Sequence, residues 1–130
     1  MKVDCTDKSV LIADDAYFIR YKIKSHIQPL KFSRIYEAEN GEQALDLYRR
    51  HEPDLALVDI IMPDTRGPNH LEKLMTEFPE ARVIVISAVD VPDFLQECIG
   101  MGITDFVTKP FTKEELLEAV EAALEAGDNA

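Results

Sequence analysis

Several features that mark other classes of protein are missing from this 130-residue sequence. It has only two cysteines, Cys5 and Cys98, which form no Cys-x-x-Cys pair, so neither a zinc site nor a redox motif is indicated. Free thiols in a reducing compartment are the plain interpretation. No apolar run approaches the roughly 20 residues of a membrane-spanning helix, and the N-terminus has no apolar signal core. We therefore expect a cytoplasmic protein that is neither exported nor inserted in a membrane.

Basic side chains are also scarce. Lys and Arg number 14 against 25 Asp and Glu, giving a net charge of −11. Because binding to a phosphate backbone needs a basic surface, direct DNA or RNA binding is disfavoured, and an acidic membrane surface would repel the chain. The acidic excess is concentrated in the last expected helix, which we interpret as a solvated face, with selection of a basic partner as the alternative. Its acids are Glu114, Glu115, Glu118, Glu121 and Glu125.

The chain that remains has an ordinary globular balance, with 46% hydrophobic and 30% charged residues. Its length predicts a single domain spanning 1–130, with a core over about 8–126 and short tails. Five short apolar runs suit strands, at 9–13, 34–38, 55–58, 82–86 and 103–107. Helical patterns lie between and after them, at 16–28, 41–50, 69–77, 92–101 and 113–126.

This fivefold alternation predicts an α/β fold in which helices cover both faces of a parallel sheet. Ligands bind such sheets at the carboxyl ends of the strands. Chemically active side chains stand at those ends: Asp14, Asp15, Asp59, Ser87 and Lys109.

Three carboxylates gathered at one edge would repel one another, and a hard divalent cation such as Mg²⁺ would offset that repulsion. A lysine and a hydroxyl beside the cation would suit phosphoryl transfer, which depends mainly on positioning and charge neutralisation. A carboxylate can itself be the nucleophile and form an acyl phosphate. The residues therefore predict a phospho-accepting aspartate with a bound metal ion.

The same segments carry a resemblance to a known family. They are LIADDA at 11–16, EAENGEQAL at 37–45, DLALVDIIMPDTRG at 54–67, VIVISA at 83–88 and GITDFVTKPF at 102–111. The chain resembles a response regulator receiver domain of the stand-alone, CheY-like kind, over about 8–126. The ordered set is specific, including Met62-Pro63 and Gly67 after Asp59 and a Lys109-Pro110 pair that is prone to a cis peptide. The resemblance implies a flavodoxin-like, doubly wound (βα)5 domain with strand order 2-1-3-4-5.

The resemblance also implies the role of each site residue. Asp59 would accept a phosphoryl group from a histidine kinase or phosphotransfer protein. Mg²⁺, with Mn²⁺ as a possible substitute, would be held by Asp15, Asp59 and the backbone carbonyl of Ile61, and by Asp14 largely through water. Lys109 and the Ser87 hydroxyl would bind phosphoryl oxygens. The domain would thus be a switch that catalyses its own phosphorylation and dephosphorylation rather than a conventional enzyme.

Ser87 and Phe106 would then act as the switch pair. Movement of Ser87 toward the phosphate would let the aromatic ring turn inward and alter the face made by the fourth helix, fifth strand and fifth helix. A downstream target protein would read that face, which is also a possible homodimer surface. Pro68 departs from the family pattern, which usually has an apolar residue there, so the third helix is expected to begin late or to be short.

Plainer interpretations apply to other polar residues. His26, His51 and His70 show no metal-ligand spacing and are expected on the surface. A basic stretch lies around the first helix and is expected to be a solvated face, or alternatively to dock an acidic surface of a histidine kinase or phosphotransfer protein. Its residues are Arg20, Lys22, Lys24, Lys31 and Arg34.

Other functions remain open beside the phosphorylated switch. One is a phosphorylation-independent interaction module, and another is a receiver domain taken from a longer regulator. A flavodoxin-like enzyme or nucleotide binder would want a glycine-rich phosphate loop after the first strand. Residues 13–18 there read ADDAYF, which is acidic and has no glycine.

Overall fold

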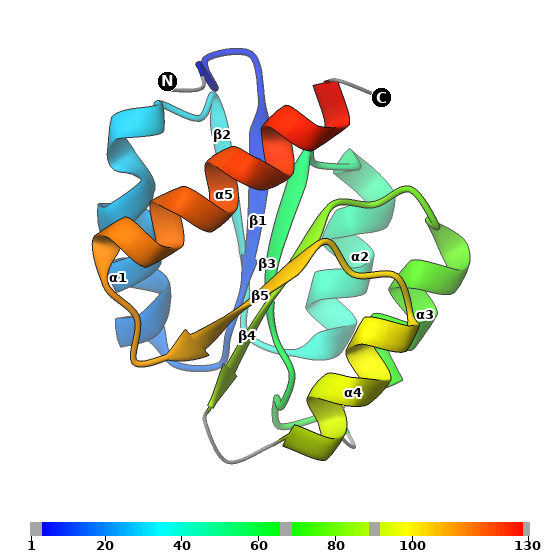
Figure 1. The fold of residues 1–130 in the computed structure, drawn as a ribbon. Coiled ribbons are helices and arrows are strands. Elements are labelled where there is room, and N and C mark those ends of the chain that lie inside the picture. Colours follow the sequence, from blue (N-terminus) through cyan, green and yellow to red (C-terminus); the bar gives the residue numbers. More distant parts are fainter. Residues whose placement is uncertain (1–3, 66–68, 89–91, 129–130) are drawn as a thin grey trace.

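The computed structural model describes residues 4–65, 69–88 and 92–128. Strands and helices alternate through these ranges, with a short 3-10 helix at Gln28–Leu30 after the first helix. The elements are β1 (Ser9–Ala13), α1 (Tyr17–Ile27), β2 (Arg34–Ala38), α2 (Gly41–His51), β3 (Leu55–Asp59), α3 (Asn69–Glu77), β4 (Val83–Ala88), α4 (Pro92–Gly100), β5 (Asp105–Lys109) and α5 (Lys113–Asp128). The strands form one parallel sheet in the order β2-β1-β3-β4-β5 (Figure 1). This confirms the predicted α/β, doubly wound (βα)5, flavodoxin-like fold.

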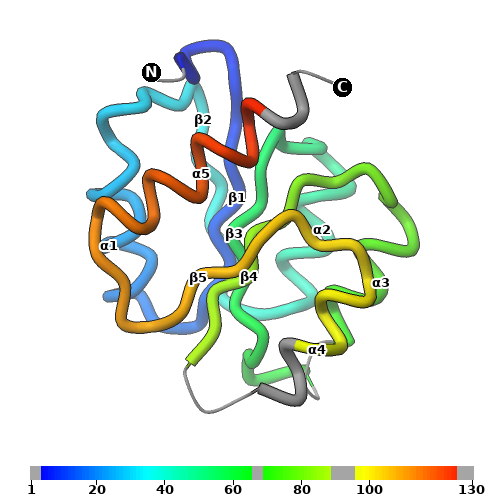
Figure 2. The backbone as a smooth tube through the Cα atoms, in the orientation of Figure 1, coloured from blue at the N-terminus to red at the C-terminus, as the bar shows by residue number. Residues whose placement is uncertain are grey.

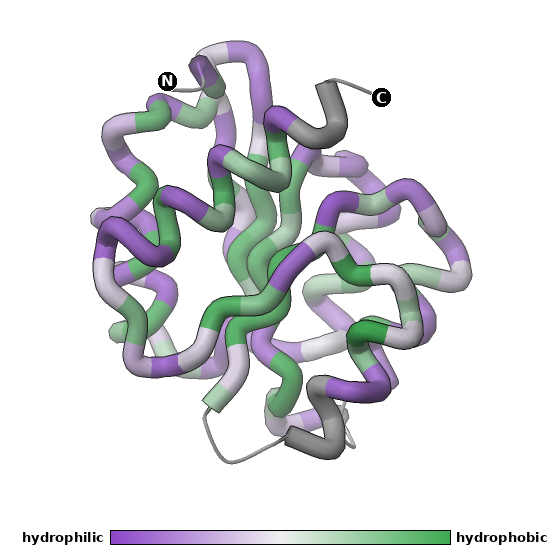
Figure 3. Tube along the Cα trace, in the orientation of Figure 1, coloured by the Kyte–Doolittle hydropathy of each residue, from purple (hydrophilic) through white to green (hydrophobic). Residues whose placement is uncertain are grey.

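The three central strands are buried on both faces, which explains their continuous apolar sequences. Successive side chains of a strand point to opposite faces, so Val10 and Ile12 of β1 join one core cluster, while Leu11 and Ala13 join the other. Helices α1 and α5 cover the first cluster, and α2, α3 and α4 lie on the opposite side of the sheet (Figure 1). Coloured by hydropathy, the central strands are the most continuously hydrophobic part of the trace (Figure 3).

The outer strands differ from the central ones. At the edge of the sheet, β2 buries only Ala38, so its weak apolar pattern is that of a strand with one partner. At the other edge, β5 runs from Asp105 to Lys109 and so begins later than predicted. Lys109 is consequently the last residue of the strand and is held by the ladder to β4.

Helix ends follow the local sequence closely. The Asn40 side chain accepts a hydrogen bond from the Gln43 amide and caps α2. Before α5, Thr112 and Glu115 exchange side-chain to backbone hydrogen bonds of 3.1 and 3.2 Å and so form a capping box. Gly102, which follows the end of α4, has a positive φ of 91°, a conformation that favours glycine.

Two large hydrophobic residues of the helices are exposed rather than packed in the core. Phe18 is 67% exposed and Ile99 is 51% exposed. In α1 the buried positions are Arg20, Ile23 and Ile27, and Phe18 lies outside the stripe that they define. The cysteines are buried and free, as predicted.

The third helix begins at Asn69 and has nine residues, consistent with the expectation of a short helix. Gly67 and Pro68, both noted in the sequence, lie outside the described residues. No helix in the described ranges is both long enough and apolar enough to cross a membrane.

Strand register determines which side chains can meet. The ladder pairs Ala13 with Val58, Asp59 with Ile86 and Ala88 with Lys109. The carboxyl ends of β1, β3 and β4 therefore gather at one edge, the lower edge of the backbone trace in Figure 2. Residues that follow these strands are brought together there.

Candidate functional site

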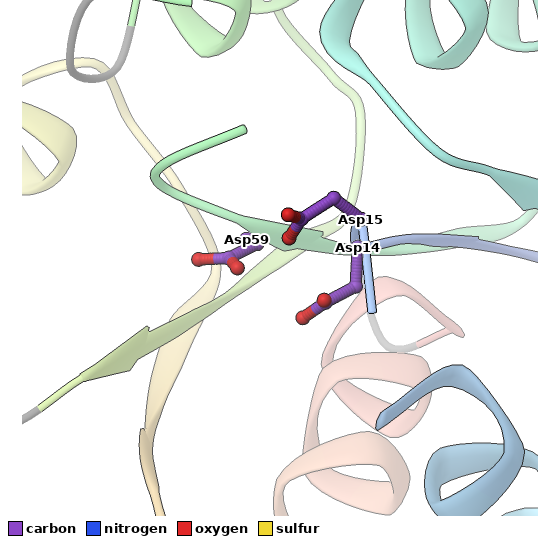
Figure 4. Close-up of side chains that lie close together, drawn as sticks. All are labelled: Asp14, Asp15 and Asp59. Atoms are coloured by element: carbon purple, nitrogen blue, oxygen red, sulfur yellow. The ribbon is translucent and has the colours of Figure 1, made fainter. Parts of the chain in front are cut away.

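Three aspartates meet at the carboxyl edge of the sheet. Asp14 and Asp15 follow β1, and Asp59 ends β3, the strand beside it. One carboxylate oxygen from each lies within 4.8 Å of the other two. Figure 4 shows the three side chains converging from these adjacent strand ends. Asp14 and Asp59 are buried, whereas Asp15 is exposed, so the cluster opens to solvent on the Asp15 side.

Lys109 reaches this cluster from the edge strand. Its Nζ atom donates to Asp14 Oδ2 at 2.9 Å and to Asp59 Oδ2 at 3.0 Å. Because β4 separates β3 from β5, the long lysine stem crosses the end of β4 to make these bonds. The Lys109-Pro110 peptide bond is cis.

The site carries more negative than positive charge. Burial and the nearby Asp14 charge raise the pKa of Asp59, although Lys109 acts in the opposite direction. Burial by itself would lower the pKa of Lys109, but its bonds to Asp14 and Asp59 outweigh burial and raise it. Lys109 is therefore a fixed positive charge, and with all three carboxylates ionised it leaves two negative charges uncompensated.

The donor set fits a hard divalent cation. The three carboxylates supply only oxygen atoms, and the opening beside Asp15 gives access to the waters that Mg²⁺ retains. The backbone amide of Ile61 donates to Asp59 Oδ1 at 3.3 Å, so the loop after β3 folds back over the site. The predicted role of the Ile61 carbonyl as a metal ligand stays a prediction.

Comparison with known proteins decides the family. The response regulator receiver domain family matches residues 10–121. The chain belongs to this family. The chain is 38% identical to the chemotaxis protein CheY of Bacillus subtilis over 115 residues, which cover 88% of this chain and 96% of the relative. Protein CcdB of the same organism is 39% identical over the same shares.

A solved structure agrees with this assignment. The receiver domain of AraT, a response regulator from Geobacillus stearothermophilus, superposes with a TM-score of 0.85 at 33% identity. The match covers 94% of this chain and 96% of that one. The acidic cluster is thus of the kind typical of a receiver domain's phosphorylation and Mg²⁺ site.

Arg20 is bonded to the backbone of the acidic cluster, contrary to the prediction that it lies on a solvated basic face. It is buried, and its guanidinium donates to the Asp14 carbonyl and, at 3.0 Å, to Glu37 Oε1. These bonds fix the backbone where the acidic pair begins. The signal that could have revealed it is spacing, because position 20 lies three residues before Ile23 and seven before Ile27.

His70 is a second correction, since it was expected on the surface. The residue is buried in α3, and its Nε2 atom lies 2.8 Å from the backbone carbonyl oxygen of Asp59. Its position, four residues before Leu74, is on the buried face of the helix. By contrast His51 is exposed, as predicted, and His26 is half-buried.

The two residues expected to form the switch are not engaged with the aspartates. Ser87 is buried at the end of β4, where its hydroxyl donates to the Ala88 carbonyl at 2.9 Å. Phe106, on β5, is 40% exposed. The register places Phe106 beside Val85, two residues before Ser87.

Proposed function

We propose that this receiver domain accepts a phosphoryl group on Asp59 from the phosphohistidine of a histidine kinase or phosphotransfer protein. One observation carries the proposal: Asp59 and Asp14, both buried, are bridged by Lys109 at the carboxyl edge of the sheet. Of the three aspartates, Asp59 is the one that is both half of the lysine bridge and the C-terminal residue of its strand.

The transfer is a substitution at phosphorus. A carboxylate oxygen of Asp59 attacks, a P–O bond forms as the P–N bond breaks, and the electron pair of that bond returns to the imidazole. Lys109, already held at this point, pairs with a phosphoryl oxygen and offsets its charge. Asp15, Asp59 and the Ile61 carbonyl would hold Mg²⁺, with Asp14 acting largely through water, and the bound ion would supply further positive charge for the phosphoryl oxygens.

Intact-mass spectrometry tests this step directly. The protein is incubated with acetyl phosphate and Mg²⁺ beside an Asp59→Asn variant and an EDTA control. We expect a gain of one phosphoryl group in the wild type and none in either control. No gain with acetyl phosphate or with a panel of histidine kinases, although Mg²⁺ binding is intact, would favour a phosphorylation-independent interaction module.

The donor is proposed to dock on the exposed start of α1. Tyr17, Phe18 and Tyr21 are each more than half exposed there, next to the acidic pair. Lys22 lies on the same helix and adds a positive charge suited to an acidic partner, whereas Lys24 is paired with Glu37 at 2.9 Å. Phe18→Ala is expected to slow transfer from a kinase while leaving phosphorylation by acetyl phosphate unchanged. Equal slowing with both donors would contradict docking at this surface.

Output is proposed to pass through the face formed by α4, β5 and α5. Supporting this, the Ser87 hydroxyl bonds to Ala88 and Phe106 is partly exposed, an arrangement suited to the unphosphorylated state. A phosphoryl group on Asp59 would attract the hydroxyl and allow the ring to turn inward. The chain has no tryptophan, so Phe106→Trp gives a single fluorescent reporter. Its emission should shift to shorter wavelength on phosphorylation, and an unchanged spectrum in a phosphorylated sample would contradict this switch.

A further inference from the structure

Two backbone carbonyls at the acidic edge are each held by a buried side chain from the helix that follows. Arg20 of α1 holds the carbonyl of Asp14, and His70 of α3 holds the carbonyl of Asp59. The second bond differs in kind because it acts on the proposed phosphoacceptor itself. It links the nucleophilic residue to α3 through a single hydrogen bond of 2.8 Å.

This hydrogen bond determines which nitrogen of the His70 imidazole carries the proton. A carbonyl oxygen only accepts hydrogen bonds, so Nε2 must carry a proton, and in the neutral imidazole Nδ1 is then an acceptor. Among the described residues, buried Nδ1 has no hydrogen-bond partner. An unpaired buried polar atom is costly, and an apolar side chain of similar size would avoid that cost. Packing therefore does not account for histidine here, whereas the bond to Asp59 does.

The surroundings hold the histidine in place. A Cβ atom added to Gly41 would lie 3.1 Å from His70 Cβ and 2.7 Å from Thr65 Cγ2, so the start of α2 packs closely against this residue. The start of α2 is fixed in turn, because the Asp64 carboxylate accepts hydrogen bonds from the amides of Gly41 and Glu42. His70, on α3, is thus packed against the capped start of α2.

We infer that His70 is a positioning residue for phosphorylation: by holding the Asp59 carbonyl, it fixes the strand end and so the direction in which the Asp59 carboxylate presents itself to phosphorus and metal. The inference rests on the proposed function of Asp59. A hydrogen bond that orients a reacting carboxylate without touching phosphorus or metal still matters, because the reaction rate and the metal affinity both depend on the orientation of that carboxylate.

The test compares His70→Leu, which removes the donor, with His70→Gln, whose amide can still donate to the carbonyl. Phosphorylation by acetyl phosphate and Mg²⁺ affinity are measured on each. We expect both to fall about tenfold in the leucine variant and to stay close to wild type in the glutamine variant. Leu74→Ala is the matched control, because it destabilises the same helix from a buried position with no side-chain donor.

Three results would overturn the inference. These are a wild-type phosphorylation rate in His70→Leu, an equal loss in His70→Gln, or an equal loss in Leu74→Ala. The imidazole nitrogens of the wild type give an independent check by long-range ¹H–¹⁵N NMR. A protonated Nε2 with a bare Nδ1 supports the bond, whereas a protonated Nδ1 with a bare Nε2 excludes it, even if a variant fails to fold.

The outcomes also separate this inference from the proposed function. A wild-type protein that takes no phosphoryl group would contradict the role of Asp59. The tautomer and the Mg²⁺ affinity of His70→Leu would still decide whether His70 positions this carboxylate.

Discussion

Lys109 and Asp59 are 50 residues apart in sequence, yet the lysine ammonium lies 3.0 Å from the aspartate carboxylate. The same ammonium lies 2.9 Å from Asp14, so one positive charge holds together two acids from adjacent strands. The contact has two consequences. It limits repulsion within the acidic cluster, and it places beside the proposed nucleophile a positive charge that is proposed to pair with a phosphoryl oxygen.

Replacing Lys109 with methionine should therefore destabilise the metal-free protein. We expect Lys109→Met to lower the free energy of unfolding by about 1–3 kcal/mol, between the values for exposed and fully buried ion pairs. Added Mg²⁺ should restore more stability to this variant than it adds to the wild type, because the cation replaces the missing charge. Urea unfolding with and without Mg²⁺ measures both effects, with Lys73→Met, at an exposed position of α3, as the control. Equal Mg²⁺ responses in the two proteins would contradict the account.

The raised pKa of Asp59 makes its ionisation unfavourable in the folded protein. Below the usual value of 3.8 the group is protonated in both states and has no effect, and the wild type loses stability as pH rises through the higher folded-state pKa. Asp59→Asn should thus be more stable than the wild type at pH 7 without metal, with the difference shrinking toward pH 4. Unfolding curves across this range test the sign, with exposed Asp7→Asn as the control.

Added Mg²⁺ should change which of the two proteins, the wild type or Asp59→Asn, is the more stable. Binding to the folded wild type at 100 times the dissociation constant adds about 2.7 kcal/mol to the free energy of unfolding. Asp59→Asn, which lacks one of the charged ligands, should gain less. An Asn variant that is less stable than the wild type at pH 7 without metal would contradict the electrostatic description of the site.

Gly41 is expected to resist substitution for a steric reason. A Cβ atom at this position would meet Thr65, His70 and Asp64 at 2.7, 3.1 and 3.3 Å. Gly41→Ala should lower the free energy of unfolding by about 1–3 kcal/mol, the usual cost of overpacking. Gly100→Ala is the matched control, since a Cβ atom there meets nothing within 4 Å. Chemical unfolding of both variants is the measurement, and equal stabilities would refute the close approach of α2 to α3.

The two thiols should be unreactive in the native protein. Burial raises the pKa of Cys5 and of Cys98 to about 11 each, so about one thiol in a thousand is ionised at pH 8. We expect slow labelling by a thiol-specific disulfide reagent in buffer and rapid labelling of both cysteines in urea. Rapid modification of either cysteine in the folded protein would show that its burial is incomplete.

The acidic site could be predicted because each of its members has a simple local signature. Asp14, Asp59 and Lys109 each stand at the end of an apolar strand, and parallel strands bring such ends together. The strand order and the cis peptide followed from resemblance to the receiver family rather than from periodicity. The register that places Asp14 beside Asp59 needed the structure.

The supporting shell could not be predicted in the same way. Arg20 and His70 are polar residues that usually lie on the surface, and their burial depends on backbone carbonyls supplied by other elements. Helical spacing puts both residues on buried faces. They were nevertheless predicted to lie on the surface, because their side chains are polar. Phe18 is the converse case, because its side chain is hydrophobic while its position on the helix faces solvent.

The most direct test of the central claim is to locate the phosphoryl group. Wild-type protein treated with acetyl phosphate and Mg²⁺ is reduced with borohydride, which converts an aspartyl phosphate to homoserine, and peptides are sequenced by mass spectrometry. We expect conversion at Asp59 alone. Conversion at Asp14 or Asp15, or phosphorylation that survives in Asp59→Asn, would contradict it.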